Sequence, residues 1–254
     1  MSEKIQSSYT LFDHLLELRT RLLHSVLGVL IVFCSLAYFA QDLYQYLALP
    51  LLSTMPEGTQ MIATDVASPF FAPFKLTIVL SMFIAMPYIL FQVWSFIAPG
   101  LYRNEKRLII PLMVGSTLLF YGGIAFAYFA VFPVVFSFFN SVVPEGVTIA
   151  TDISSYLDFV LKLFFAFGVA FEIPIVIILL CWTGVTDVNS LRNKRPYVIV
   201  GAFFIGMLLT PPDIISQTML AIPMLLLFEI GLIFASFYTK KDNEIESVND
   251  HGNN

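Results

Sequence analysis

Six long apolar stretches constrain this chain more than any other feature of its sequence. A helix of about 18 or more apolar residues is long enough to cross a hydrocarbon core of about 30 Å. The stretches are 22–41, 75–98, 108–132, 156–182, 197–211 and 217–237. They are continuously apolar, whereas strands of a membrane barrel alternate over about ten residues. Because backbone groups in lipid must bond internally, the pattern predicts an all-α integral membrane protein with six transmembrane helices.

Composition supports this class and excludes several others. Hydrophobic residues make up 58% of the chain and charged residues 12%, against roughly 45 to 50% and about 25% in soluble proteins. Cys34 and Cys181 lie inside apolar stretches and have no metal-ligand spacing. The sequence contains no HExxH motif, phosphate-binding loop or GxSxG elbow. We therefore expect no enzyme, no cofactor, no metal ion and no nucleic-acid partner; the net charge is -5, but the charges are unevenly distributed.

The distribution of Lys and Arg predicts the orientation. If the N-terminus is cytoplasmic, the loops on that side hold eleven of the 13 basic residues and the loops on the other side hold none. The other two, Lys75 and Lys162, lie near outer span ends, from which they can reach the interface. Since cytoplasmic loops carry the excess of Lys and Arg, both termini are predicted to be cytoplasmic.

The spans form one predicted membrane domain, 1–237. An amphipathic helix is predicted near its start, and a polar tail is predicted after its end. Residues 10–21 predict an amphipathic helix at the inner interface, because leucines recur on one face opposite Glu17 and Arg21. Glu17 and Arg21 are four residues apart, so one interpretation is a surface anchor in which they pair with each other. The polar segment 238–254 is predicted to be a disordered cytoplasmic tail.

The fifth span is unusually short. Its 15 residues, at about 1.5 Å each, reach only about 22 Å, so the bilayer is expected to thin there. The connection to the sixth span, 210–213, has the sequence TPPD, which predicts a tight hairpin because two prolines end the helix.

Two acids interrupt the apolar pattern. Glu172 lies near the middle of the fourth span and is followed by Pro174, which predicts a kink. A charge at that depth costs at least about 2.5 to 3.5 kcal/mol, so Glu172 should face a wet cavity, find a partner or be protonated. Glu229 in the sixth span raises the same question. Asp158 and Lys162 are spaced as a structural i,i+4 pair.

Glu17 and Glu105 are acids on an inner surface that is otherwise basic. One interpretation of Glu105 is a solvated loop residue among Arg103, Lys106 and Arg107. The alternative is that both carboxylates bind guanidinium groups in bidentate fashion, which Lys cannot reproduce.

Several of these stretches closely resemble the TatC family, a subunit of the twin-arginine protein translocase. The matching segments are FDHLLELRTRL (12–22), FIAPGLYRNEKR (96–107), FEIP (171–174), TPPDIISQ (210–217), AIP (221–223) and FEIG (228–231). They occur in the order of the family and fit its six-span topology. The resemblance implies a concave, cupped bundle with short fifth and sixth spans, in the inner membrane of a bacterium.

The resemblance also implies a function and its residues. The implied protein is a receptor for twin-arginine signal peptides that, with the single-span subunits TatA and TatB in an oligomeric complex, exports folded proteins using the proton-motive force. The implied sites are signal-peptide binding at Glu17, Arg19, Phe96 and Glu105, an acid facing the concave side at Glu172, TatA and TatB docking at Met207, Thr210 and Gln217, and the outer hairpin at Asp213.

Two other functional classes stay open from the residues alone. Glu172 and Glu229 within spans are compatible with a small-solute or proton-coupled transporter. Pairs of small residues, Gly123 with Ala127 and Ala202 with Gly206, are compatible with a scaffold for partner helices.

Overall fold

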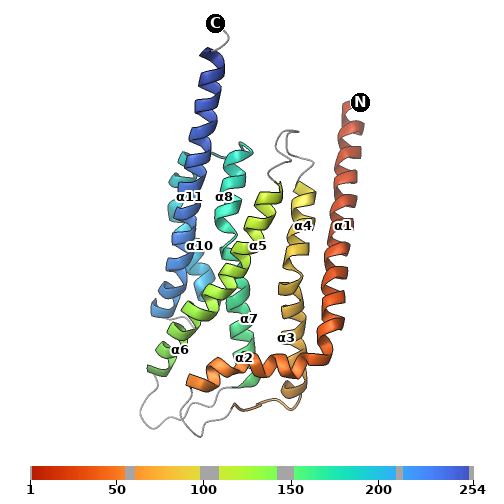
Figure 1. Ribbon diagram of the computed structural model, residues 1–254, viewed down its shortest axis with the longest axis vertical. Coiled ribbons are helices and arrows are strands. Elements are labelled where there is room, and N and C mark those ends of the chain that lie inside the picture. Colours follow the sequence, from red (N-terminus) through yellow and green to blue (C-terminus); the bar gives the residue numbers. More distant parts are fainter. Residues whose placement is uncertain (1, 55–60, 98–108, 142–151, 210–213, 252–254) are drawn as a thin grey trace. The chain divides into compact units, whose positions relative to one another are not determined.

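The computed structural model describes residues 2–54, 61–97, 109–141, 152–209 and 214–251 (Figure 1). Over these residues the regular elements are all helices, and the only β pairing is an isolated bridge between Ile62 and Asp152. The predicted all-α class is therefore confirmed. The chain divides into two compact units, Met1–Thr117 with Thr148–Asp158, and Leu118–Val147 with Phe159–Asn254.

The first unit is built on a long N-terminal helix. Its elements are α1 (Ser2–Leu36), the 3-10 turn η1 (Ala37–Phe39), α2 (Ala40–Thr54), α3 (Ser68–Ile84) and α4 (Met86–Ile97). Helix α1 packs against α3 and α4, and α2 packs against α3. Figure 1 shows α2 turning sharply away from the direction of α1. Helix α2 was not predicted, because residues 42–74 follow the first predicted span and were assigned to the outer loop.

A bend interrupts the predicted second span. The sequence predicts one helix over 75–98, whereas α3 ends at Ile84, α4 begins at Met86, and their axes differ by 50°. Pro87 has no N–H to donate to the carbonyl one turn back. The hydroxyls of Thr77 and Ser81 also donate to carbonyls four residues earlier, at 2.8 and 2.6 Å, a pattern that bends helices.

The second unit contains the remaining helices. They are the end of α5 (Ile109–Phe126), a π-helical turn η4 (Ala127–Val131), α6 (Phe132–Ser141), most of α7 (Ile153–Ala170), α8 (Ile173–Trp182), α9 (Val188–Asn193), α10 (Arg195–Leu209) and α11 (Ile214–His251). Helices α8 and α10 both pack against α11. Buried Ala202, Ala221 and Met224 form one core of this packing, and Ile177, Phe228 and Leu232 belong to another.

The lengths of the apolar helices support a multi-span membrane protein. Among the described residues, four helical segments are long and apolar enough to cross a bilayer: His14–Leu47, Ile110–Phe138, Ile153–Trp182 and Gln217–Phe237. A fifth is present if the bent pair α3 and α4 forms one span. Helix α10, which corresponds to the predicted short fifth span, has 15 residues.

Both terminal segments of the chain are helical in the backbone. The predicted amphipathic helix, 10–21, is the N-terminal part of α1 and continues without a break into its apolar part. Helix α11 continues to His251, through most of the segment for which the sequence predicts disorder. That segment contains no Gly or Pro before Gly252, so a helix nucleated in the apolar part can propagate through it.

Candidate functional site

A cluster of polar side chains lies where α1 meets α4. Nη2 of Arg21 donates a hydrogen bond to Oε1 of Glu17 at 3.3 Å, and Nη1 donates to Oε1 of Gln92 at 3.1 Å. Gln92 is buried, with 5% of its surface exposed. The side chains of Arg21 and Glu17 are 32% and 33% exposed. The Glu17 carboxylate is thus partly accessible, and Arg21 has a second, buried acceptor in Gln92.

Helix periodicity and close packing place these groups together. Glu17 and Arg21 are one turn apart on α1, so their side chains share a face. Gln92 joins them from a position 71 residues later because α1 and α4 are in contact. A Cβ atom at Gly28 would lie 2.7 Å from Cδ1 of Tyr88, so a glycine is required for α1 and α4 to approach this closely.

An aromatic contact extends the cluster toward the N-terminal end of α1. The rings of His14 and Phe96 are stacked, with centroids 4.5 Å apart and an interplanar angle of 28°. Arg19 is exposed nearby on α1. The structure therefore brings Glu17 and Phe96 to the same end of the contact between α1 and α4. Glu105, the other predicted acid, lies outside the described residues.

A mostly apolar hollow begins one turn further along α1. It measures about 400 Å³ and lies between α1 and the junction of α3 with α4. Its lining includes His24, Leu27, Gly28, Ala85 and Tyr88. No sequence pattern indicated this hollow, because residues from helices far apart in the sequence line it.

Glu172 lies in the turn between α7 and α8. The turn comprises Phe171 and Glu172, and the kink predicted from Pro174 is confirmed by this break in the helix. Glu172 is half-buried as a residue, and its Oε1 atom is buried. A Cβ at Gly231 would lie 2.9 Å from Cα of Pro174, so α11 packs tightly against the start of α8.

Two of the predicted docking residues occupy different environments on α10 and α11. Met207 is exposed on α10. Gln217 on α11 is half-buried, and its Nε2 donates to the carbonyl of Phe203 on α10 at 2.6 Å. A Cβ at Gly206 would lie 3.1 Å from Cγ of Gln217. Gln217 therefore links α10 to α11 by a hydrogen bond. Thr210 and Asp213 lie outside the described residues.

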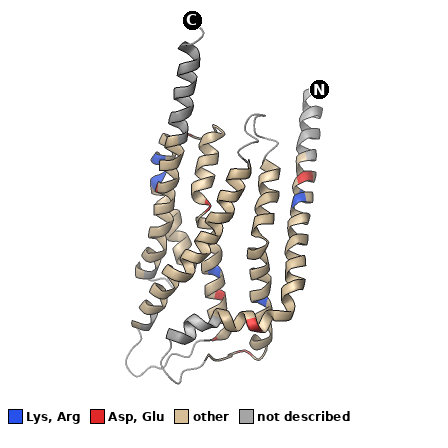
Figure 2. Ribbon diagram, in the orientation of Figure 1, with Lys and Arg blue, Asp and Glu red and all other residues tan. Residues whose placement is uncertain are grey.

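Figure 2 shows few charged residues on the described helices, with long uncharged stretches between them. Glu229 accepts a hydrogen bond from Nη2 of Arg195 at 2.6 Å, across α10 and α11. Asp158 on α7 forms an ion pair with Lys75 on α3. The prediction that Asp158 pairs with Lys162 is wrong, because the contact between α3 and α7 offers it a cation from another helix.

A second carboxylate with several hydrogen bonds lies just before α7. Asp152 accepts hydrogen bonds from the backbone N–H groups of Thr64 and Ser155 and from both hydroxyls. These donors, the backbone N–H of Thr64 first, hold the pKa of Asp152 well below its usual range. This site was not predicted, although an Asp three residues before a Ser at a helix start is a capping signal.

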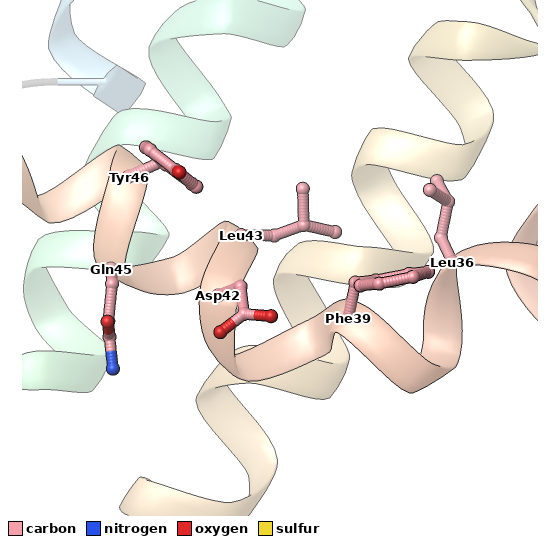
Figure 3. A pocket seen from close by; sticks show the side chains of 6 residues that line it. All are labelled: Leu36, Phe39, Asp42, Leu43, Gln45 and Tyr46. Atoms are coloured by element: carbon pink, nitrogen blue, oxygen red, sulfur yellow. The ribbon is translucent and has the colours of Figure 1, made fainter.

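The bend between α1 and α2 carries a larger hollow of about 560 Å³ (Figure 3). Its lining includes Leu36, Phe39, Asp42, Leu43 and Tyr46. Figure 3 shows the side chains of Leu43 and Gln45 pointing to opposite sides of α2. No residue predicted for peptide binding lines this hollow. Among the described residues, no group of three or more His, Cys, Asp or Glu side chains is placed to hold a metal ion.

The small-residue pairs considered for partner helices are used inside the chain. A Cβ at Gly123 would lie 2.4 Å from the carbonyl oxygen of Phe167. Ala127 and Ala202 are buried, and Gly206 packs against Gln217. These residues therefore serve internal packing in the second unit.

Comparison with known proteins gives a consistent family match. Residues 13–223 match the model of the family described as "Sec-independent protein translocase protein (TatC)". A protein of that name from Haemophilus influenzae is 62% identical over 240 residues, covering 94% of each chain. One from Escherichia coli strain K12 is 56% identical over 242 residues, covering 95% of this chain and 94% of the relative.

A solved structure agrees with these relatives. The crystal structure titled "Twin Arginine Translocase Receptor- TatC" superposes with a TM-score of 0.81 at 41% sequence identity. The match covers 89% of this chain and 99% of the other.

Proposed function

Because the chain belongs to the TatC family of Sec-independent protein translocase proteins, we propose that it is the translocase subunit that binds twin-arginine signal peptides. The chain is a core subunit of the Tat translocase and a membrane protein of a transport family rather than of a family of catalytic enzymes. The proposal concerns which of its residues bind the peptide and the partner subunits.

The proposed peptide site comprises Glu17, Arg19, Phe96 and Glu105. The observation that carries it is the polar cluster between α1 and α4, where Glu17 offers a partly exposed carboxylate at the same end of the helix contact as the stacked rings of His14 and Phe96. A guanidinium can bind such a carboxylate through two parallel hydrogen bonds. The apolar hollow that begins one turn along α1 supports binding of an apolar segment after the arginines.

The proposed topology has six spans with both termini in the cytoplasm, in a bacterial inner membrane. The spans are about 22–41, 75–98, 108–132, 156–182, 197–211 and 217–237, in one membrane domain. The absence of Lys and Arg from the predicted outer loops supports this orientation. The apolar 15-residue helix α10 supports a short fifth span.

The proposed partners are the single-span subunits TatA and TatB, in an oligomeric complex that uses the proton-motive force. Exposed Met207 supports docking at the outer part of α10, together with Thr210 and Gln217. We propose that Glu172 faces the concave side of the bundle and that Asp213 belongs to the outer hairpin. The half-buried position of Glu172 at a helix break supports a functional polar group within the membrane.

Peptide titration tests the proposed site. The full-length chain in lipid nanodiscs is titrated with a labelled Arg-Arg signal peptide and with its Lys-Lys variant. Glu17→Gln with Glu105→Gln should weaken binding of the Arg-Arg peptide far more than that of the Lys-Lys peptide. Asp42→Asn, which neutralises an exposed acid at the other end of the first unit, is the matched control. Equal losses for both peptides would rule out guanidinium recognition by these acids.

The transporter alternative has less support. Of the two acids that suggested it, Glu229 forms an ion pair with Arg195. A transporter should move a small solute or protons when the purified chain is reconstituted alone, whereas a receptor should bind only the peptide.

A further inference from the structure

We propose that Arg21 is an internal competitor that an arginine of the signal peptide must displace from Glu17, and that Gln92 retains Arg21 after the displacement. This inference rests on the proposed function, because it assumes that Glu17 receives a peptide guanidinium. It assigns to Arg21 and Gln92 a role in setting the affinity of the site for its peptide.

The geometry of the Glu17 to Arg21 contact is that of a displaceable partner. A single N–H of Arg21 contacts Glu17, at 3.3 Å, whereas good charge-assisted hydrogen bonds measure about 2.7 to 2.9 Å and guanidinium pairs are often bidentate. About a third of each side chain is exposed, so water screens the pair. A peptide guanidinium that makes two shorter hydrogen bonds to Glu17 therefore binds this carboxylate more strongly than Arg21 does.

Gln92 gives Arg21 a second hydrogen-bond partner. Its carbonyl oxygen accepts from the other nitrogen of Arg21 at 3.1 Å, and the residue is 5% exposed. Leaving a buried amide oxygen without a donor is costly, so Arg21 keeps this bond when it releases Glu17. Because Gln92 lies on α4 and accepts from a different nitrogen, Arg21 can release Glu17 to the peptide arginine and still keep one hydrogen-bond partner.

The retained Arg21 charge sets a threshold for the ligand. A lysine ammonium is a compact point charge that cannot form a bidentate pair with a carboxylate. It would have to displace Arg21 with a single contact while being repelled by the nearby guanidinium. An arginine compensates through its second hydrogen bond. The cost of displacing Arg21 is common to both ligands, so it lowers both affinities by a similar factor, and only the ligand with two hydrogen bonds to Glu17 keeps a high affinity.

Two variants with opposite expected effects test this competition, in the full-length chain in nanodiscs and with the Arg-Arg and Lys-Lys peptides as probes. Arg21→Gln removes the competitor, so binding of the Lys-Lys peptide should tighten by about tenfold, which corresponds to about 1.4 kcal/mol. Binding of the Arg-Arg peptide should tighten by a similar factor, because the cost of displacing Arg21 is the same for both ligands. Gln92→Leu frees Arg21 to bind Glu17 with both nitrogens, so binding of the Arg-Arg peptide should weaken.

A double variant completes the cycle. In the Arg21→Gln background, Gln92→Leu should have little effect on peptide binding, because the competitor it would strengthen is absent. Unchanged affinities for both peptides in Arg21→Gln overturn the inference, as does a loss of binding of either peptide. A loss caused by Gln92→Leu that persists at full size in the double variant also overturns it, since it would indicate a packing effect.

Glu17→Gln separates this inference from the function on which it depends. If Glu17→Gln leaves binding of the Arg-Arg peptide unchanged, the proposed peptide site fails. If Glu17→Gln weakens that binding but Arg21→Gln leaves the affinity for both peptides unchanged, only the role of Arg21 fails. Thermal unfolding of each variant in detergent identifies misfolded protein, and the opposite expected signs for Arg21→Gln and Gln92→Leu cannot both arise from misfolding.

Discussion

Asp152 is hydrogen-bonded to Thr64, a residue 88 positions earlier in the chain. Its Oδ1 accepts from the backbone N–H of Thr64 at 3.0 Å and from the hydroxyl at 2.8 Å. Its Oδ2 accepts from the backbone N–H of Ser155 at 2.9 Å. One carboxylate thus joins the segment that precedes α3 to the first turn of α7, within the first unit.

This contact predicts a pH dependence of stability. The pKa of Asp152 is lowered by folding, so its contribution is present above the unfolded pKa of about 3.9 and is lost as pH falls below that value toward the folded pKa. Asp152→Asn should remove this dependence. It should also cost about 1 kcal/mol at pH 7, because the NH₂ group of Asn cannot accept from Ser155. Thermal unfolding at pH 7 and pH 3.5 measures both effects, and equal acid sensitivity in the variant would contradict the prediction.

Replacement of Gly123 should destabilise the second unit. A Cβ there would lie 2.4 Å from the backbone oxygen of Phe167, so Gly123→Ala forces α5 and α7 apart at a cost of about 1 to 3 kcal/mol. Gly201→Ala is the matched control, since nothing lies within 4 Å of its Cβ position and Ala favours the helix. Denaturant titration of both variants should give a lower stability for Gly123→Ala alone.

The ion pair between Lys75 and Asp158 should appear as coupling in a double-mutant cycle. Both side chains are partly exposed, so the expected coupling between Lys75→Gln and Asp158→Asn is at most about 1 kcal/mol. The same cycle with Lys162→Gln in place of Lys75→Gln is the control and should be close to additive. Larger coupling to Lys162 would restore the i,i+4 pairing expected from the sequence.

Loss of the Glu229 carboxylate should affect stability rather than proton transport. Glu229 is bonded to Arg195 at 2.6 Å within the proposed sixth span, so Glu229→Gln, which leaves Arg195 without its charged acceptor, should lower stability by about 1 to 3 kcal/mol. In vesicles that carry a pH-sensitive dye, the variant and the parent chain should give the same proton flux. A flux that depends on Glu229 would favour the transporter class.

Lengthening α10 should impair transport but not peptide binding. Four residues inserted after Val200 would extend this 15-residue helix by about 6 Å and remove its mismatch with the bilayer. Cargo export should fall, whereas titration with the Arg-Arg peptide should give an unchanged affinity. The same insertion after Lys241, outside the spans, is the control. Normal export by the α10 variant would exclude a role for membrane thinning.

Much of the helical architecture could be predicted from local patterns. The continuous apolar stretches predicted the long helices correctly, and Pro174 predicted the break at Glu172. The bend at Ala85 was missed although Pro87 was visible, because a proline within a span is also compatible with a continuous helix. Helix α2 was missed because its 15 residues lie in a segment that was read as a loop.

Within the candidate site, only the contact between neighbouring turns of one helix could be predicted from the sequence. The spacing of Glu17 and Arg21 indicated their pairing, and the structure confirms it. Gln92 gave no signal, since a single glutamine in an apolar helix carries no periodicity of its own. The contact between His14 and Phe96 likewise depends on how α1 meets α4.

The sequence by itself determined that this chain is a helical membrane protein, because burial in lipid and internal backbone hydrogen bonding depend on runs of neighbouring residues. Only the tertiary structure decided which charged and polar groups meet: Arg21 with Gln92, Lys75 with Asp158, and Thr64 with Asp152. These partners lie on different segments, and short-range packing between helices, which no local pattern encodes, brings their atoms within hydrogen-bond distance.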